Sequence, residues 1–309
     1  MKTLTPALYA EKYHDTAKDI HADLRLQEAE AGDYILPRRR PVSHKYSYGR
    51  ALVIAGALGY SGAPVLAANA CERSGAGLTH LMTPESIYAI AAARCDGAVV
   101  TPLPANGRGS ISAEALPQIL EQLQKANACV VGPGLGTGPD SQALVKGILR
   151  GAACPLMLDA DALTALSGET TLLDSCAAPL ILTPHEGEFK RLGGDLGGGR
   201  LHGALAFTKE HPHLILILKG YGTLVCRGGE AAVNPTGGPA MAKGGAGDVL
   251  CGVLCALLAQ GFDPWFAARC AVWLHGAAGD LAAAETGEYS LAPSDLIRHL
   301  PEAFQTLIR

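Results

Sequence analysis

The chain has 309 residues, of which 48% are apolar and 5% aromatic, and its formal net charge is −4. This length suits one large α/β domain, or two small ones, with a core built mainly from aliphatic side chains. The weak net charge gives no global reason to expect nucleic acid or an anionic membrane as a partner, so any phosphate must be bound locally.

Cysteine use and the N-terminal sequence both predict a soluble cytoplasmic protein. The nine cysteines are scattered without a C-x-x-C pair, as expected for free thiols in a reducing compartment. Cys251 and Cys255 are four residues apart, but no histidine or acid completes a ligand set, so we do not expect a metal there. The first residues lack the apolar segment of a signal peptide, and no uninterrupted apolar run reaches the roughly 18 residues of a membrane span.

Residues 1–43 predict an N-terminal arm ahead of a single domain at 44–309. The arm is charged and indicates one or two short surface helices, followed by an extended, proline-bounded segment that ends in LPRRRPVSH. We interpret the basic run at 38–40 as part of a solvated linker, although it could also touch a nucleotide phosphate.

From residue 50 onwards, short apolar runs alternate with helical patterns. Their order is ALVIAG, APVLAANACERSG, LTHLM, PESIYAIAAARC, ACVVG, SQALVKGILRG, PLMLDA, PLILTP, EGEFKRLGG and LILILKG. This alternation is typical of a parallel sheet covered on both faces, so the predicted fold class is α/β and doubly wound. The runs TLVCRGG and EAAVNP predict a hairpin at a sheet edge, and helices are expected over 246–260, 264–284 and 293–308. Because ligands of such sheets bind at the carboxyl ends of the strands, the residues after each apolar run are the candidates for a site.

Two glycine-rich turns follow predicted strands. The glycines of GALGYSG (56–62) lead into a helix that starts near Ala63, a spacing that admits a ligand close to the backbone but also suits a plain tight turn. Gly134 and Gly136, after CVVG, free further amides that would suit an anion or the edge of a ribose.

Acidic residues and a histidine follow the next two strands. Asp159 and Asp161 flank Ala160 just after a strand, and Asp161 could equally be the N-cap of the next helix. His185 stands at a strand–helix corner, where it could be structural or belong to a binding site. Glu186 and Glu188 could simply stabilise the N-terminus of the following helix.

Lys219 ends the apolar strand LILIL, where its burial is costly unless the ammonium meets an anion. We interpret it as a contact to a phosphate or adenylate group, with a surface lysine that extends to solvent as the alternative. Thr223 starts the next strand and can offer a hydroxyl.

The stretch NPTGGPAMAKGGAGDVLCG (234–252) places glycines and a single acid just before an apolar helix. Gly244, Gly245, Ala246 and Gly247 would supply successive free amides at the helix N-terminus, a nest that binds a phosphoryl group and stabilises charge developing on it. Asp248, in the first turn, can be the general base for a hydroxyl that attacks the phosphoryl group. An ordinary helix cap is the alternative, but a cap requires one favourable residue rather than four small ones. The motif is not a P-loop, because GxxxxGK[ST] is absent.

These residues belong to a longer set of blocks that resembles a known family. The blocks are HKYSYGRALVIAGALGYSGAPVLAANACERSGAGL, VVGPGLG, LDADALTAL, ILTPHEGEF, ILKGYGTLV, NPTGGPAMAKGGAGDVLCGVLCALLAQG and HGAAGDLAA. In this order they are similar to ADP/ATP-dependent NAD(P)H-hydrate dehydratases, which have the ribokinase-like fold. The resemblance covers about residues 36–309.

The resemblance implies a reaction that repairs hydrated nicotinamide cofactor. ADP or ATP, with Mg²⁺, would phosphorylate the added hydroxyl of (6S)-NADHX or (6S)-NADPHX, and loss of phosphate would restore NADH or NADPH. By the same resemblance, the nucleotide would contact Lys219, Gly220, Tyr221, Gly222, Thr223 and Gly247. The hydrated cofactor would contact Ala63, Gly136, His185 and Asp248, while Gly245, Ala246 and Gly247 assist Asp248 in catalysis, and Asn234, Thr236 and Gly244 shape the site. No metal ligands are assigned.

Some features depart from the family pattern. Tyr46 stands where glycine is common, and Lys243 and Ala246 replace frequent threonines; Lys243 could add charge near the phosphate or alter the choice of nucleotide. The arm at 1–43 leaves no room for the epimerase domain often fused to this family, so we expect a separate epimerase. The family, whose members tend to form tetramers, predicts a homo-oligomer. A ribokinase-like vitamin or sugar kinase and a non-enzymatic nucleotide sensor are the alternative functions.

Overall fold

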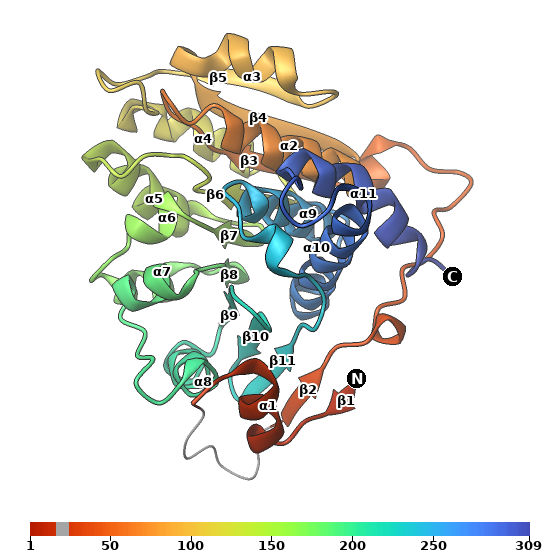
Figure 1. The fold of residues 1–309 in the computed structure, drawn as a ribbon. Helices are drawn as coiled ribbons and strands as arrows, with labels where there is room; N and C mark the ends of the chain where they lie inside the picture. The colour runs from red at the N-terminus through yellow and green to blue at the C-terminus, as the bar shows by residue number, and fades with distance from the viewer. Residues whose placement is uncertain (17–24) are drawn as a thin grey trace.

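An eleven-stranded sheet forms the centre of the computed structural model, which describes residues 1–16 and 25–309 (Figure 1). The strand order is β1-β2-β11-β10-β9-β8-β7-β6-β3-β4-β5. The strands are β1 (Lys2–Thr3), β2 (Arg25–Glu28), β3 (Arg50–Ile54), β4 (Leu78–Pro84), β5 (Val99–Leu103), β6 (Ala128–Val131), β7 (Leu156–Leu158), β8 (Leu180–Leu182), β9 (Leu214–Leu218), β10 (Leu224–Arg227) and β11 (Glu230–Val233).

Helices flank this sheet along the described chain. The α-helices are α1 (Pro6–Tyr13), α2 (Gly62–Arg73), α3 (Tyr88–Arg94), α4 (Leu116–Leu123), α5 (Pro139–Gly151), α6 (Asp161–Thr164), α7 (Glu186–Arg191), α8 (Arg200–Glu210), α9 (Ala246–Ala259), α10 (Pro264–Thr286) and α11 (Pro293–Gln305). Short 3₁₀ helices lie at Ala31–Asp33, Lys45–Tyr48, Glu85–Ile87, Ala113–Ala115, Thr170–Ser175 and Pro239–Met241. The three predicted C-terminal helices are confirmed.

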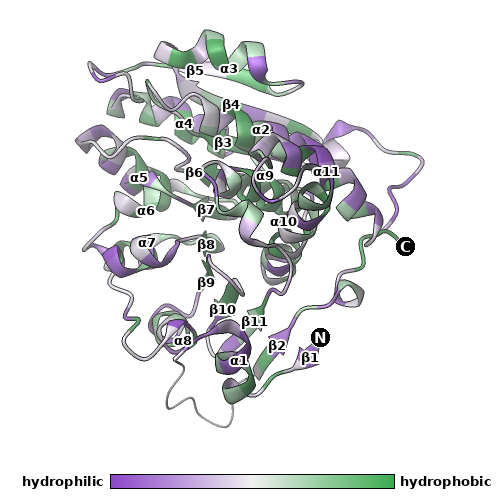
Figure 2. Cartoon of the chain, in the orientation of Figure 1, coloured by the Kyte–Doolittle hydropathy of each residue, from purple (hydrophilic) through white to green (hydrophobic). Residues whose placement is uncertain are grey.

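Strands β3 to β9 pair in parallel, as the alternation of apolar runs and helices predicted. Because side chains alternate along a strand, β6 sends Val130 into the core under α2, α9, α10 and α11, and sends Cys129 and Val131 into the core under α4 to α8. Hydrophobic residues run along the central strands and α10, and hydrophilic residues are more frequent on the peripheral helices and loops (Figure 2). The doubly wound α/β prediction is therefore correct.

The predicted hairpin is present, but it is not at the edge of the sheet. β10 and β11 pair antiparallel, with Leu224 opposite Val233. β2 then pairs in parallel with β11, and β1 pairs antiparallel with β2, so the outermost strand comes from the N-terminus. Neither β1 nor β2 was predicted, because β1 is two residues long and β2, RLQE, has no apolar run. β2 also depends on pairing with β11, which is distant in sequence.

The N-terminal arm is also less superficial than predicted. α1 is the expected short helix, but its Tyr9 and Tyr13 are buried in the core next to α8. Farther along, Leu36 exchanges backbone hydrogen bonds with the last residues of the chain, its amide donating to Leu307 and its carbonyl accepting from Arg309. The arm thus binds the body of the protein at two places, while its residues 17–24 lie outside the described part.

Helix α9 lies at the centre of the layer on its side of the sheet, with twelve of its fourteen residues buried. A helix that is apolar on all sides is typical of a core position, and α9 packs between the sheet, α2 and α10. In the described residues, no helix is both long and apolar enough to cross a bilayer. The position of α9 matters because its first turn carries Asp248.

Close packing of α9 against α2 depends on Gly252. A Cβ at this position would lie 2.2 Å from the carbonyl oxygen of Ala67 and 2.6 Å from the Cβ of Ala70. We expect Gly252→Ala to lower the free energy of unfolding by about 1–3 kcal/mol, because the helix backbones must separate. Urea unfolding followed by circular dichroism measures the change, and Gly229→Ala, which meets nothing within 4 Å, is the matched control. Equal stability of the two variants would contradict this account of the packing.

Candidate active site

A cavity of about 800 Å³ opens at the N-terminus of α9, at the carboxyl end of β9. It brings together all six residues predicted to contact the nucleotide and several of those predicted for catalysis, substrate binding or support. These are His185, Lys219, Gly220, Tyr221, Gly222, Thr223, Asn234, Thr236, Gly244, Ala246 and Gly247. The cavity has the position that a doubly wound sheet favours for a ligand.

The backbone at the start of α9 presents free amides to this cavity. Gly245 is the N-cap residue with φ +99°, a left-handed conformation that favours glycine. The amides of Gly244, Gly245, Gly247 and Asp248 donate to no other described residue. The prediction that Ala246 also has a free amide is wrong, because the turn at Gly245 folds this N–H back onto the carbonyl of Lys243 at 3.4 Å. The remaining amides still form a nest for an anion at a helix N-terminus.

Asp248 follows this nest in the first helical turn. Burial, and then the charge of Asp159, raise the pKa of Asp248 to about 7, and the ammonium of Lys219 works in the opposite direction. A carboxylate with a pKa near neutrality can both hold and release a proton under working conditions. This property suits the predicted general base.

Lys219 meets its anion within the protein. Its Nζ lies 2.7 Å from Oδ1 of Asp159 and 3.7 Å from Oε2 of Glu188. Burial disfavours the ammonium, but the two carboxylates outweigh it and raise the pKa of Lys219 above its ordinary value. A bound phosphate is therefore not required to explain the burial of Lys219. Lys219 nevertheless lines the cavity next to Gly247, where an added Cβ would lie 3.6 Å from Nζ.

A second cavity, of about 570 Å³, is lined by Gly136 and by residues of the loop around Ser110. The amide of Gly136 donates to Asp161 at 2.8 Å. Asp161 is not the N-cap of α6: Ala160 has that place, with φ +47°, and this turn directs the Asp161 carboxylate to the neighbouring loop. Asp159 is buried and accepts from Thr183 at 2.7 Å and from Lys219 at 2.7 Å. The two aspartates thus have different partners, and both of their charges act on Asp248.

The predicted substrate residues do not share one cavity. His185 lines the first cavity and Gly136 the second, and Ala63, in the first turn of α2, lines neither. His185 is the N-cap of α7, where its Nδ1 accepts from the amides of Gly187 at 2.9 Å and Glu188 at 3.2 Å. Its Nε2 lies 3.5 Å from Oε1 of Glu188, and the half-exposed side chain can still contact a ligand.

The loop from Gly220 to Thr223 is held by interactions that the sequence did not reveal. The Thr223 hydroxyl donates to the carbonyl of Gly220, so it closes the turn. Arg200 donates to the carbonyl of Tyr221 at 2.6 Å. Tyr13 of the arm packs against Gly222 and Tyr221, with the two tyrosine rings 5.5 Å apart. One contribution of the arm is therefore to support this loop.

Asn234 and Thr236 are anchored to α10. Asn234 Nδ2 donates to the carbonyl of Val272 at 3.4 Å, and the Thr236 hydroxyl donates to that of Trp273 at 2.9 Å. Lys243 donates to the carbonyl of Tyr289 at 2.7 Å, so its charge lies at the rim of the cavity. These contacts fit the predicted supporting role of Asn234 and Thr236.

His275 of α10 was missed as a site residue, although the block HGAAGDLAA contains it. It lines the first cavity, and its Nε2 lies 2.8 Å from the carbonyl oxygen of Ala246, inside the nest. Burial lowers the pKa of His275 to about 4, so the ring is neutral at physiological pH and donates this hydrogen bond. The sequence did offer one signal for His275. It precedes Gly276 in a helix, and Gly276 has no side chain because Thr236 lies against it.

We expect His275→Phe to raise KM for the adenine nucleotide about tenfold or more, because the carbonyl of Ala246 loses its donor and the nest relaxes. His275→Gln keeps an N–H donor and should restore most of the loss. The pH profile should not move, since His275 is already neutral. Steady-state kinetics over pH 6–9 measures the KM of both variants and the pH profile. A shifted profile would indicate that His275 transfers a proton instead of positioning the nest.

Comparison with known proteins adds to this geometry. A family model described as NAD(P)H-hydrate dehydratase matches residues 51–302. The bifunctional NAD(P)H-hydrate repair enzyme Nnr of Moorella thermoacetica is 38% identical over 292 residues, which are 93% of this chain and 55% of the relative. Its counterpart in Gloeobacter violaceus is 43% identical over 266 residues, 85% of this chain and 51% of the relative. The chain therefore spans about half the length of these curated relatives.

Solved structures agree with the sequence relatives. The ADP/ATP-dependent NAD(P)H-hydrate dehydratase of Bacillus subtilis, co-crystallised with ATP and Mg²⁺, has a TM-score of 0.76 and 29% identity, covering 93% of this chain and 100% of its own. A ribokinase-like superfamily protein of Enterococcus faecalis has a TM-score of 0.80 and 27% identity, covering 94% and 99%. Since the family model spans most of its length, the chain belongs to the NAD(P)H-hydrate dehydratase family.

Proposed function

We propose that this protein uses ADP or ATP to dehydrate (6S)-NADHX and (6S)-NADPHX, returning NADH and NADPH. The observation that carries the proposal is that Asp248, with its pKa near 7, directly follows the free amides of the nest in the first turn of α9. Family membership supports the choice of substrate, and it disfavours the vitamin or sugar kinase. A mere nucleotide sensor would have no use for a tuned carboxylate at position 248.

In the proposed mechanism, the carboxylate of Asp248 accepts the proton of the hydrate hydroxyl, and the hydroxyl oxygen bonds to the terminal phosphorus of the nucleotide. The bond from that phosphorus to the bridging oxygen breaks, and the amides of Gly245 and Gly247 donate to the migrating phosphoryl group. The ring nitrogen's electron pair then expels phosphate, and a proton leaves the neighbouring ring carbon. This sequence restores the dihydropyridine and explains why the acid and the nest are adjacent.

The two cavities suit two ligands. We infer that the nucleotide occupies the cavity lined by the Gly220–Thr223 loop, while the hydrated cofactor reaches Asp248 from the side of Gly136 and Asp161. His185 Nε2 and Ala63 then contact the part of the cofactor nearest to them. The charges of Asp159 and Asp161, which both act on Asp248, would disfavour a second anion anywhere but at the nest.

Mg²⁺ accompanies the nucleotide in this proposal. The described residues form no group of three or more His, Cys, Asp or Glu able to hold a metal, so no protein cage for it exists in the described part of the chain. Mg²⁺ often keeps few protein ligands and binds largely through phosphate oxygens and water. When bound with the nucleotide, Mg²⁺ would neutralise phosphate charge.

The decisive experiment incubates the protein with NADHX plus ADP, and separately plus ATP, and follows the absorbance of restored NADH. Recovery with either nucleotide supports the dehydratase, and the two rates establish the preferred phosphoryl donor. Retention of phosphate on the organic product, without NADH, would support the kinase instead. The same assay with NADPHX establishes the cofactor preference.

Other properties follow the family and are part of the proposal. We propose a cytoplasmic location, which the nine free cysteines support, and a homo-oligomer such as a tetramer. A separate epimerase would interconvert the hydrate epimers and so supply the (6S) form. Size-exclusion chromatography with light scattering tests the oligomeric state.

A further inference from the structure

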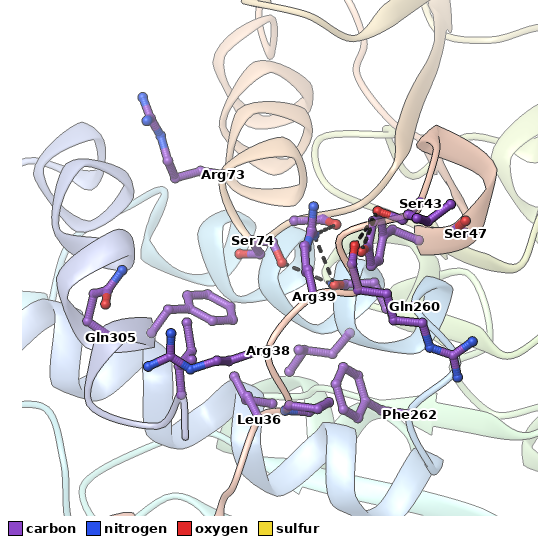
Figure 3. Close-up of a pocket in the computed structure, with 18 residues that line it drawn as sticks. Leu36, Arg38, Arg39, Ser43, Ser47, Arg73, Ser74, Gln260, Phe262 and Gln305 are labelled. Carbon is purple, nitrogen blue, oxygen red and sulfur yellow. Dashed lines mark hydrogen bonds between the residues drawn. The ribbon is translucent and has the colours of Figure 1, made fainter.

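A third cavity, of about 1050 Å³, lies at the opposite end of α9 from the candidate active site (Figure 3). Its walls come from the proline-bounded arm segment and from the C-terminal ends of α2, α9 and α11. It shares no lining residue with the two cavities described above. The fourteen residues of α9 separate it from the nest by about 20 Å at 1.5 Å per residue.

The charge of this cavity is one-sided. Arg38, Arg39, Arg40 and Arg73 line it, and no aspartate or glutamate does, although the chain as a whole carries a net charge of −4. None of these arginines forms an ion pair with another described residue. Arg39 is held in place, with its guanidinium 3.8 Å above the Tyr48 ring and a hydrogen bond to Gln260 at 3.2 Å (Figure 3). All four side chains are exposed and therefore solvated, but the excess of positive charge in this cavity favours an anion over a cation.

The segment that carries three of these arginines is fixed before any ligand binds. Pro37 and Pro41 flank the run and restrict its backbone. The hydrogen bonds of Leu36 tie one end to the C-terminus, and at the other end the Tyr48 hydroxyl donates to Ser43 at 2.9 Å. Residues 37–47 are exposed, as expected for a solvated segment, although both ends are tied to the body of the protein. The segment shares no cavity with the residues predicted to contact the nucleotide.

Below the arginines the cavity has an apolar floor formed by Leu257, Phe262, Phe304 and Ile308. A ligand that suits both parts has an anionic end and an organic body. Arginine binds phosphate through two parallel hydrogen bonds, and several arginines require more than one negative charge. The cavity volume is at the upper end of the range for small-molecule sites.

We propose that this cavity is a binding site for a small soluble organic polyphosphate, distinct from the nucleotide that takes part in the reaction. The phosphates bind between Arg38, Arg39 and Arg40, and the organic body lies over the apolar floor. The site is independent of the proposed dehydratase activity, because none of its residues touches the nest or Asp248.

The test is calorimetric titration with ATP and with inorganic tripolyphosphate. The unmodified chain is expected to bind two molecules of ATP per protomer, and Arg38→Ala/Arg40→Ala only one. Arg94→Ala/Arg150→Ala is the matched control, since it removes the same charge from exposed positions away from the cavity and should still bind two. Tripolyphosphate should bind the arginine site at least tenfold more weakly than ATP, because it has no organic body.

The arginine pair makes no side-chain hydrogen bond to another described residue, so its variant should fold and keep the dehydratase rate. One ATP site in all three proteins, or two in all three, would overturn the proposal. Sedimentation velocity tests the alternative that another protein chain occupies this cavity. A changed oligomeric state of Arg38→Ala/Arg40→Ala with unchanged ATP stoichiometry would identify a protein interface and overturn the proposal. Tripolyphosphate binding as tight as ATP would exclude the organic part of the ligand.

Discussion

Asp248→Asn is expected to lower the turnover number for NADHX dehydration by about 10²- to 10⁴-fold, the usual contribution of a general base, while adenine-nucleotide affinity stays nearly unchanged. The amide of residue 248 and the nest remain, but the side chain no longer accepts the hydroxyl proton. In the unmodified enzyme, kcat/KM should rise with pH through about 7, as Asp248 loses its proton, and this rise should disappear in the variant. Stopped-time assays and nucleotide titration measure the two properties separately.

Asp96→Asn, at an exposed carboxylate far from the cavities, is the control and should behave as the unmodified enzyme. Activity of Asp248→Asn within threefold of normal would remove Asp248 from the role of base. A loss of nucleotide affinity equal to the loss of turnover would instead indicate that the substitution disturbs the nest.

The same carboxylate should make stability depend on pH. Its ordinary pKa is 3.8 and the folded value is about 7, so between these values the unfolded chain releases this proton and the folded chain keeps it. The free energy of unfolding therefore falls as pH rises through this window. Asp248→Asn has no such proton, so it should be more stable than the unmodified protein at pH 8 and about equal at pH 4. Thermal unfolding at both values measures the difference.

Lys219→Met is expected to lower the free energy of unfolding by about 3–5 kcal/mol, because it leaves the buried Asp159 and Glu188 without their cation. Loss of the ammonium should also raise the pKa of Asp248 further, since Lys219 is the group that lowers it. The rise of kcat/KM with pH should then occur at higher pH than in the unmodified enzyme. Urea unfolding and pH–rate profiles measure these effects.

Two further variants separate the charge network from the nucleotide contact. Lys190→Met, an exposed lysine of α7, is the matched control and should change neither stability nor pH profile. Lys219→Met/Asp159→Asn removes one buried charge of each sign and should regain much of the stability lost in Lys219→Met. If Lys219 contacts the nucleotide, however, KM for the nucleotide should be raised in both variants. Recovery of both the stability and the KM for the nucleotide in the double variant would show that Lys219 acts only through Asp159.

Local patterns in the sequence were sufficient for the parallel sheet, the three C-terminal helices and the glycine nest before Asp248. Apolar runs, helical spacing and consecutive small residues are properties of neighbours along the chain, and they do not require knowledge of what packs against them. Membership of the dehydratase family could also be expected from the ordered blocks. For the same reason the sequence predicted Asp248 as the acid next to free amides.

Tertiary structure alone decided what each candidate meets in space. Lys219 finds its anion at Asp159, sixty residues away, Ala246 loses its free amide to a turn, and Asp161 faces Gly136 instead of capping its helix. β2 pairs with a strand some two hundred residues later, and His275 reaches the nest from another helix. Burial and the charges of distant residues set a pKa, and closed backbone turns direct side chains. Both depend on contacts between segments that no local pattern encodes.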